Sequence, residues 1–402
     1  MKEGWQTKTL GETCEVVNGG TPKTGVPEYW DGQHRWITPA EMGKRLSPYV
    51  SDTERMITDL GLRNSSAQML PRYSVILSSR APIGHLVINT ELMATNQGCK
   101  GLIPRSQLQH KFLYYYLSSI VDLLNSLGTG ATFKELSGGK LKEVEIPVPP
   151  LAEQQRIVGV LDEAFEVLAT AKANAEKNLQ NARALFESHL QSVFTHRGPG
   201  WVEKRLEEVL TVQPQNGWSP PAANHTDSGT QVLTLSSVTG FVFRPDKLKY
   251  TSAKTDPKAR YWVQNGDLLI TRSNTPELVG HVAIASGIER PTVYPDLIMR
   301  MNPDPARAVT KFLYYHLRTP ALREEITGRA QGANPTMKKI SNGAVRTLPV
   351  LLPSLDEQLR IVTQLDALTA ETQRLARLYE QKLAALAALK KSLLHQAFSG
   401  EL

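Results

Sequence analysis

The hydrophobic and polar positions along the chain form one pattern that occurs twice. Between residues 151 and 198, apolar residues such as Ile157 and Leu161 recur at a spacing near 3.5 positions, which is typical of an amphipathic helix. After Ser354 the apolar positions from Leu365 to Leu393 alternate by three and four. About forty helical residues form a rod about 60 Å long. The pattern therefore predicts two long helices, and Ser354 is the expected N-cap of the second.

Each predicted helix follows a region with shorter periods. Strand-like runs at residues 35–38, 74–78, 85–88 and 144–146 are bounded by Gly, Pro, Asn and Ser, as strands in a mixed domain usually are. A second region after residue 199 repeats this plan with different loops. The aromatic stretches at 112–116 and 312–315 have helical spacing, which favours core packing over base stacking. We predict an α/β (α+β) fold with two similar heads.

The junction between head and helix is the most strongly repeated stretch. It reads Pro-Pro-Leu-Ala-Glu-Gln-Gln-Arg-Ile-Val from Pro149 and Pro-Ser-Leu-Asp-Glu-Gln-Leu-Arg-Ile-Val from Pro353, so its identical residues lie 204 positions apart. The repeat indicates a duplicated unit, divided into residues 1–148, 149–198, 199–352 and 353–402. We expect the two helices to pack as an antiparallel coiled coil with pseudo-twofold symmetry. The alternative is that each helix packs only on its own head.

Charge and composition indicate the kind of partner and the cellular location. The net charge of +7 and the pI of about 9.2 favour a polyanionic partner, nucleic acid first. Cys14 and Cys99 are too few for a disulfide framework. No run approaches the ~18 apolar residues of a membrane span, and the first residues lack the apolar stretch of a signal peptide. We expect a cytoplasmic protein that does not contact a membrane.

Motifs for catalysis are not found. The stretch Gly138-Gly139-Lys140 lacks the first glycine and the Ser/Thr of a phosphate-binding loop. The nine histidines form no metal-binding motif, and the tetrapeptide of amino-methyltransferases is absent. We expect no catalytic residue, no metal site and no cofactor in this chain.

The loops that differ between the heads carry the candidates for DNA binding. They are rich in Asn, Gln, Ser, Thr, Lys and Arg, which contact phosphates and base edges. In the first head the candidates are Asn18, Thr21, Lys23, His34, Arg35, Ser79, Arg80, Thr129, Thr132 and Lys134. In the second head they are Gln215, Asn216, Ser236, Arg272, Ser273, Asn274, Gln331, Asn334, Lys338 and Lys339. Arg80 and Arg272 each end an apolar strand at a matched place, either to contact DNA or to satisfy groups of the fold.

These features together resemble the specificity subunit of type I restriction-modification enzymes. The resemblance is carried by the Trp-x-x-x-x-Leu-Gly-Glu opening from Trp5, the Gly-Thr-Gly-Ala-Thr-Phe-Lys loop at 128–134 and the repeated junction. The second head departs from that loop at residues 331–336. The resemblance implies a non-catalytic subunit that binds double-stranded DNA, with each head reading one half of an asymmetric target. It also implies two methyltransferase subunits and restriction subunits as partners, which would hold S-adenosylmethionine, ATP and Mg²⁺.

Identical residues at the junction predict a second kind of surface. Reading DNA does not require the two copies to match, whereas docking two equivalent subunits does. We therefore expect partner docking by Glu153, Gln154, Arg156, Glu357, Gln358 and Arg360. Two alternatives stay open: a coiled-coil scaffold that binds no DNA, and the separate recognition subunit of another restriction-methylation system.

Overall fold

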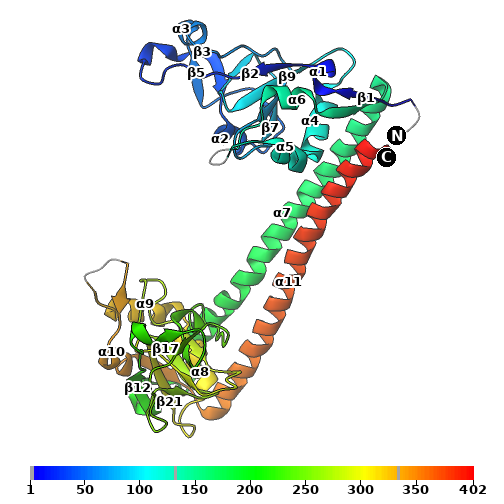
Figure 1. Cartoon of the computed structure of the whole chain (residues 1–402). Helices are drawn as coiled ribbons and strands as arrows, with labels where there is room; N and C mark the ends of the chain where they lie inside the picture. The colour runs from blue at the N-terminus through cyan, green and yellow to red at the C-terminus, as the bar shows by residue number, and fades with distance from the viewer. Residues whose placement is uncertain (1–3, 131–133, 333–335) are drawn as a thin grey trace. The chain divides into compact units, whose positions relative to one another are not determined.

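The computed structural model describes residues 4–130, 134–332 and 336–402. The chain forms two compact units: unit 1 comprises Met1–Glu176 with Glu380–Leu402, and unit 2 comprises Lys177–Tyr379. The long helices α7 (Leu151–Thr195) and α11 (Leu355–Ser399) each contribute residues to both units (Figure 1). Each unit thus holds one head, the first turns of the helix that follows it and the last turns of the other helix.

The described residues of the first head form three sheets and several short helices. Their strand orders are β2-β9-β6-β7-β4, β5-β3-β8 and β1-β10. The strands are β1 (Gln6–Thr9), β2 (Cys14–Asn18), β3 (Trp30–Ile37), β4 (Tyr49–Val50), β5 (Arg55–Ile57), β6 (Val75–Ser78), β7 (Leu86–Asn89), β8 (Met93–Thr95), β9 (Cys99–Pro104) and β10 (Glu145–Val148). The helices are α1 (Leu10–Thr13), η1 (Pro27–Tyr29), α2 (Pro39–Met42), α3 (Asp59–Arg63), α4 (His110–Ser119), α5 (Val121–Leu127) and α6 (Gly138–Lys142).

The second head repeats the main sheet with the order β12-β21-β17-β19 and adds a five-stranded sheet, β13-β15-β14-β20-β16, and the pairs β11-β23 and β18-β22. Its strands are β11 (Val202–Arg205), β12 (Leu210–Asn216), β13 (His225–Thr226), β14 (Thr230–Leu233), β15 (Leu248–Thr251), β16 (Trp262–Val263), β17 (Leu268–Thr271), β18 (Ser273–Asn274), β19 (Val282–Ile284), β20 (Thr292–Val293), β21 (Ile298–Pro303), β22 (Lys338–Lys339) and β23 (Pro349–Leu352). Its helices are η2 (Leu206–Val209), η3 (Ala222–Asn224), η4 (Leu235–Ser237), α8 (Thr310–Leu317), α9 (Pro320–Arg329) and α10 (Asn342–Arg346).

The core of each head lies between the main sheet and one aromatic helix. Strands β6 and β17 are buried along their whole length, which explains why their sequences are continuous apolar runs rather than alternating ones. Helix α4 buries Phe112 and Leu113 completely, and α8 buries Phe312 and Leu313 in the same way. The prediction that these aromatic stretches pack in the core is confirmed.

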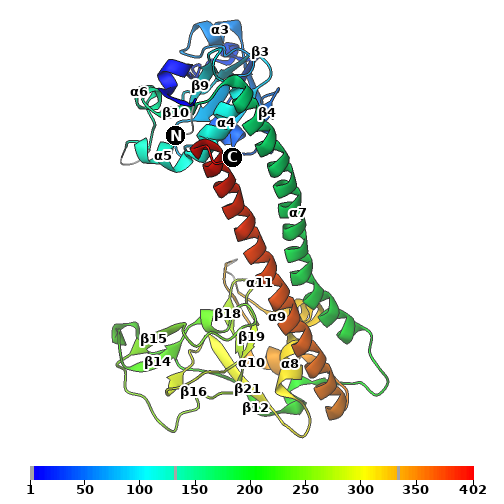
Figure 2. The same cartoon turned by 90° about the vertical axis from the view of Figure 1, so that its right-hand side faces the viewer.

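The long helices pack antiparallel within each unit. In unit 1, Ile157 and Leu161 of α7 share an apolar core with Leu394 and Ala397 of α11, and the last turns of α11 (red) lie beside the first turns of α7 (Figures 1 and 2). In unit 2 the end of α7, with Phe186 and the residues near it, shares a core with the start of α11. Each helix therefore packs on the other helix as well as on its own head, as the coiled-coil prediction requires.

Two positions of α11 differ from the predicted apolar stripe. Leu389 is half exposed, so it does not belong to the buried seam. Thr372, which interrupts the apolar pattern, is buried, and its hydroxyl donates to the carbonyl of Leu368 at 2.8 Å, a bond that satisfies a hydroxyl inside a helix. Ser354 is the N-cap, as predicted, because its hydroxyl accepts from the N–H of Glu357.

Candidate DNA-binding surfaces and head–helix joints

The repeated glutamine of the first junction joins the helix to its head. Gln154 is fully buried. Its side-chain carbonyl accepts from the N–H of Gln109 at 2.9 Å, and its amide donates to the carbonyls of Gln107 at 2.9 Å and Pro149 at 2.8 Å. One side chain thereby satisfies backbone groups where three segments meet.

Gln358 makes the same contacts in the second unit. It is also fully buried, accepts from the N–H of Val309 at 2.8 Å, and donates to the carbonyls of Arg307 and Pro353. Leaving a buried polar group unpaired costs free energy. Each junction therefore needs its own glutamine to pair with these backbone groups. The burial of both glutamines argues against our expectation that Gln154 and Gln358 contact a partner subunit.

Each head also contacts its helix through the repeated aspartate of that helix. Asp162 accepts from Lys111 Nζ at 2.7 Å and from the hydroxyl of Tyr115 at 2.5 Å. Burial, followed by the hydrogen bond to Asp162, raises the pKa of Tyr115 above its ordinary value. The phenol therefore stays protonated and acts as a donor that ties helix α4 to α7.

Unit 2 repeats this arrangement on Asp366. Lys311 Nζ donates to Asp366 at 2.7 Å and the hydroxyl of Tyr315 donates to it at 2.5 Å. Burial, and then the bond to Asp366, raises the pKa of Tyr315. We name the two sets the head–helix joints: Gln154, Asp162, Lys111 and Tyr115 in unit 1, and Gln358, Asp366, Lys311 and Tyr315 in unit 2.

The charged residues of the junctions remain at the surface. Glu153 and Arg156 form an ion pair with Nε 2.7 Å from Oε2, and Arg156 Nη2 also donates to the carbonyl of Leu402 at 2.6 Å. Glu357 and Arg360 form an equivalent exposed pair. Of the six residues predicted to dock a partner, these four present side chains that another subunit could reach.

The first group of DNA-binding candidates gathers where strand β6 ends. Arg80 and Glu135 pair through their backbones, and so do Thr129 and Glu135. The N–H of Ala81 donates to the carbonyl of Lys134 at 3.2 Å. Backbone hydrogen bonds therefore hold the loop that carries Thr129 and Lys134 at the end of β6. We call Arg80, Thr129, Lys134 and Glu135 the first strand-end cluster.

Polar residues from neighbouring strands border this cluster. Asn18 ends β2 and pairs with Lys100 at the start of β9. Thr21 accepts a hydrogen bond from the Asn96 amide at 2.9 Å and donates to Gln97. Asn96 and Gln97 were missed as candidates, although residues 96–98 form a polar turn before a strand, which is a signal for an exposed loop.

The second head builds a matching edge from different residues. Strand β18 pairs antiparallel with β22, so that Ser273 lies opposite Lys339 and Asn274 opposite Lys338. Gln331 pairs through its backbone with Lys339. These five residues, Ser273, Asn274, Gln331, Lys338 and Lys339, form the second strand-end cluster. Asn216, at the end of β12 and opposite Met299, holds the place that Asn18 holds in the first head.

The prediction that Arg80 and Arg272 occupy equivalent positions is wrong, because the two arginines are offset by one residue. The carbonyl of Ser79 accepts from the N–H of Leu136, and the carbonyl of Arg272 accepts from Ile340 in the same way. Arg272 therefore corresponds to Ser79, and Arg80 to Ser273. The register shifts because the second copy of the strand carries its arginine one position earlier.

Because of this offset, Arg272 has different surroundings from Arg80. Its Nη1 donates to the carbonyl of Asp296 at 3.3 Å, and its Nε is buried. Ser79 and Ser273 are also buried, with hydroxyls that have no partner among the described residues. Their burial argues against DNA contacts through these two hydroxyls, and Arg272 takes the role of satisfying a loop carbonyl.

Several other candidates do not belong to either strand-end cluster. Arg35 lies in β3 of the three-stranded sheet, and the carbonyl of Lys23 accepts from the Trp30 indole. His34 pairs with Asp59 at 2.7 Å, and Ser236 lies in η4, where its carbonyl accepts from an arginine. Gln215 lies within β12. Thr132 and Asn334 lie outside the described residues, so their placement is not described.

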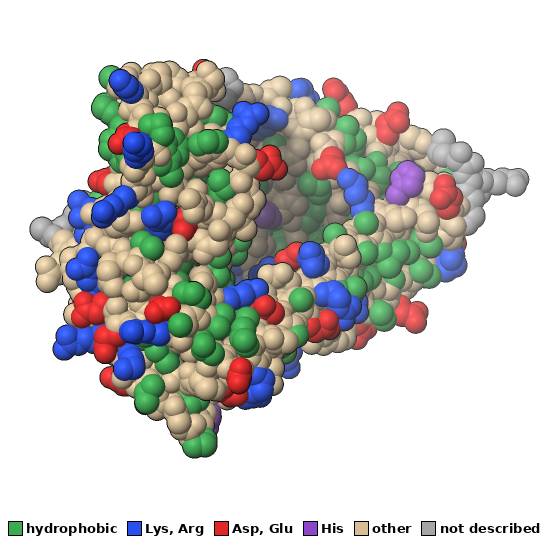
Figure 3. Space-filling view, turned by 90° about the horizontal axis from the view of Figure 1, so that it is seen from below, with side chains coloured by type: hydrophobic (Ala, Val, Ile, Leu, Met, Phe, Trp, Pro, Cys, Tyr) green, Lys and Arg blue, Asp and Glu red, His purple; other side chains and the backbone are tan. Residues whose placement is uncertain are grey.

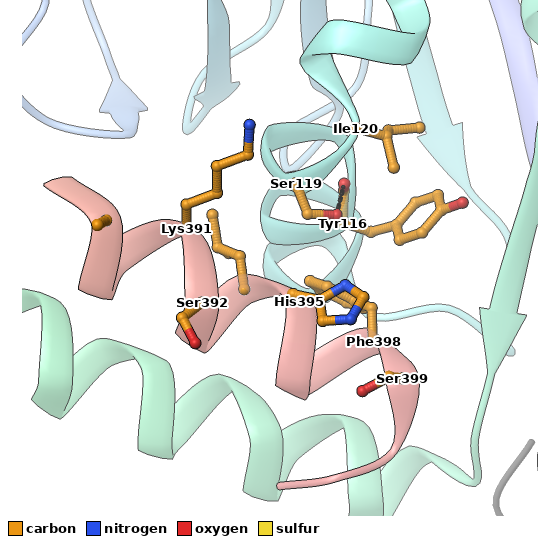
Figure 4. Close-up of a pocket in the computed structure, with 10 residues that line it drawn as sticks. Tyr116, Ser119, Ile120, Lys391, Ser392, His395, Phe398 and Ser399 are labelled. Carbon is orange, nitrogen blue, oxygen red and sulfur yellow. Dashed lines mark hydrogen bonds between the residues drawn. The ribbon is translucent and has the colours of Figure 1, made fainter.

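Charged side chains of both signs are interspersed over the face in Figure 3, with no single-sign patch dominating it. A pocket of about 500 Å³ lies in unit 1 between α4 and the end of α11, lined by Tyr116, His395 and Phe398 among others (Figure 4). Its lining is mostly apolar, which fits a gap between packed helices. None of the described helices is long and apolar enough to cross a membrane.

Two heads of one topology, each fastened by the same joint to a long helix and each carrying a different polar cluster, define a duplicated recognition protein. The family model of the type I restriction modification DNA specificity domain matches residues 2–179 and 199–382. Because these matches cover most of the 402 residues, the chain belongs to this family.

The chain is similar to curated specificity subunits. It is 34% identical over 229 residues to the type I restriction enzyme MjaIX specificity subunit of Methanocaldococcus jannaschii, covering 53% of each chain. It is 30% identical over 207 residues to the EcoR124I/EcoR124II specificity subunit of Escherichia coli, covering 50% of each. The matched region therefore spans about half the length of these two relatives.

Solved structures share the fold over the whole chain. A chain from a structure of complex assembly and conformational transition of the type I R-M system matches with a TM-score of 0.79 at 21% identity, covering 100% of this chain and 99% of that one. The crystal structure of the HsdS subunit from Thermoanaerobacter tengcongensis matches with a TM-score of 0.62 at 20% identity, covering 100% and 98%.

Proposed function

We propose that this chain is a DNA-specificity subunit that reads an asymmetric, two-part target in double-stranded DNA. Residues 1–148 and 199–352 act as target recognition domains, and residues 149–198 and 353–402 act as the spacer between them. The chain has no catalysis of its own. It acts in the cytoplasm with two methyltransferase subunits and with restriction subunits, and these partners hold S-adenosylmethionine, ATP and Mg²⁺.

One observation carries this proposal: the two heads share their joints but differ in their strand-end clusters. The same four residue types fasten each head to its helix. The clusters, in contrast, pair Arg80 with Glu135 in one head and Ser273 with Lys339 in the other. A protein that reads two different half-sites from one scaffold needs this combination, because phosphate contacts position a head and base contacts specify its sequence.

The proposal is tested by mapping methylated sites in a host that expresses this chain with its methyltransferase subunits. We expect one split motif with two different halves and a gap of fixed length. A motif without a gap, or the absence of any sequence preference, would overturn the proposal. A scaffold that binds no DNA would also fail to shift duplex DNA, whereas a specificity subunit should bind it with an affinity that falls as salt rises.

The spacer role makes a geometric prediction. Four residues inserted in each rod, next to Glu176 and Tyr379, make about one extra turn and lengthen each helix by about 6 Å. The gap in the target should then grow by about one to two base pairs, since base pairs are stacked about 3.4 Å apart. The control is the same insertion at the exposed turn of Gly229, which should leave the gap unchanged. An unchanged gap in the rod variant would refute the spacer role.

A further inference from the structure

The strand-end cluster of the first head contains an arginine held by a carboxylate. We propose that Arg80 reads a guanine in the half-site bound by this head, and that Glu135 is the positioning residue that fixes the guanidinium for that contact. This inference rests on the proposed function and adds to it one base, one reading residue and one supporting residue.

The geometry leaves the outer edge of Arg80 available. Its Nε lies 3.1 Å from Oε2 of Glu135, and the two side chains are 44% and 39% exposed. Among the described residues, the Nη atoms of Arg80 make no hydrogen bond. A guanine presents two acceptors, O6 and N7, in the major groove, and they match the parallel N–H groups of an arginine. An ion pair through Nε restrains the side chain without using the Nη groups.

The charge of Glu135 acts on two cations, Arg80 and Lys100. Lys100, which is buried, has a pKa lowered from its usual value first by burial, while the charge of Glu135 opposes this change and the charge of Arg80 adds to it. Without the carboxylate, the repulsion between the two cations would not be compensated, and the arginine would lose its ion pair with Glu135. Glu135 therefore limits the directions that the guanidinium can take, which reduces the entropy lost on binding.

The second head cannot make the same contact. Ser273 and Lys339 stand where Arg80 and Glu135 stand in the first head, and Met299 replaces Lys100. The side chain of Ser273 is buried, and a lysine offers a point charge rather than a planar fork. The equivalent position of the other half-site is therefore not read by an arginine held in this way.

The inference is tested with the full chain bound to its methyltransferase subunits. Binding is measured to duplexes in which each base pair of the target is replaced in turn. Arg80→Ala should reduce the preference for one guanine by about 10-fold or more and leave the other positions unchanged. Arg80→Lys should keep the general attraction to DNA but lose the preference for that guanine. Glu135→Gln should reduce the preference at the same base pair by a smaller factor.

Matched controls separate reading from folding. Arg72 and Glu91 form an ion pair at 2.7 Å just before β6, at the opposite end of the strand from Arg80. Arg72→Ala and Glu91→Gln should leave every base preference unchanged, and thermal melting should show that all five variants are folded.

Two results would overturn the inference. Arg80→Ala could weaken binding to all duplexes equally, which would make Arg80 a phosphate contact. Alternatively, Glu135→Gln could retain the full preference of the wild type, which would remove its positioning role. Failure of the proposed function looks different, because the wild type itself would then show no sequence preference.

Discussion

The two heads agree where they meet their helices and differ where their strands end. Gln154 and Gln358 make the same three kinds of hydrogen bond, one as acceptor and two as donor. At the strand ends, Arg80 in one head corresponds to the buried Ser273 in the other. Duplication thus preserved the attachment of each head and left its outer edge free to change.

The heads also differ in the loop that follows Gly43 in the first head and Gly240 in the second. In unit 2, Phe241 stacks on His281 with ring centroids 4.1 Å apart, and its carbonyl accepts from the hydroxyl of Tyr314 at 2.6 Å. In the first head the loop after Gly43 carries Leu46, whose side chain is fully exposed. The loop of the second head is therefore fastened to the aromatic helix by contacts that Leu46 does not make.

A third difference is a buried histidine. His316 of α8 stacks on Phe194 and its Nε2 accepts from the N–H of Leu351 at 2.9 Å. Tyr116 holds the equivalent position in α4, and its hydroxyl donates to the carbonyl of Glu145. Both side chains connect the aromatic helix to the last strand of the head, but only the histidine has an unfolded-state pKa near neutral pH.

Acid should produce the largest difference in stability between the two units. Burial lowers the pKa of His316 to about 3, and burial with the nearby Arg323 lowers that of His281 to about 4. Both values lie below the ~6.5 of an unfolded histidine. The unfolded chain therefore binds more protons than the folded one as the pH falls below ~6.5. Unit 2 should lose about 2 kcal/mol per histidine between pH 7 and pH 5.

The measurement is hydrogen exchange resolved by peptide at both pH values and corrected for intrinsic rates. Unit 2 should lose more protection than unit 1, where His110 has a lowered pKa but is only partly buried. His316→Gln keeps an acceptor for Leu351 but does not titrate, so it should reduce the acid loss in unit 2. Equal losses in both units would contradict the assignment.

The second prediction concerns the joints, where the heads should behave alike. Gln154→Leu leaves a partly buried N–H and two carbonyls, one of them buried, without their partner, and it should lower the free energy of unfolding of unit 1 by about 2–4 kcal/mol. Gln358→Leu should cost unit 2 a similar amount. Urea unfolding gives the loss, and Gln155→Ala, at the exposed neighbouring position, should be nearly neutral. A large difference between the two joints would show that the match is one of sequence only.

The smallest expected effect on stability concerns the exposed ion pairs. Arg156→Ala and Arg360→Ala should leave the melting temperature almost unchanged, because exposed ion pairs contribute little. Each variant should nevertheless retain less methyltransferase subunit in analytical ultracentrifugation, since Arg156 and Arg360 are repeated charged residues whose side chains are exposed at the two junctions. Wild-type assembly of both variants would remove the predicted docking role.

Patterns with a strong period were predictable from the sequence. The two long helices, the aromatic helices and the main strands follow from apolar spacing, and the repeat 204 positions apart showed the duplication. Burial of polar residues was not predictable in this way. Gln154 looks like a surface residue by type, and only its place between Gln109 and Pro149 shows that it is internal.

The candidate site was harder to predict, because it depends on register. Arg80 and Arg272 both end an apolar run, but a shift of one residue between the copies leaves Arg80 partly exposed and places Arg272 against a loop carbonyl. Glu135 was not a candidate because a carboxylate repels phosphates, and its value lies in the contact with Arg80. Such a pair is recognised only when two segments 55 positions apart in the sequence are seen together.

The membership of residues 380–402 in unit 1 has a consequence for synthesis on the ribosome. Phe398 packs against Phe112 and Tyr116 at centroid distances of 5.2 Å, so the first head is left with an uncovered apolar face until nearly the whole chain has been made. Unit 2 is continuous in sequence, from residue 177 to 379, and can close earlier. The part of the chain that is translated first is thus completed last, and its aromatic face is the one that a chaperone would have to shield in the meantime.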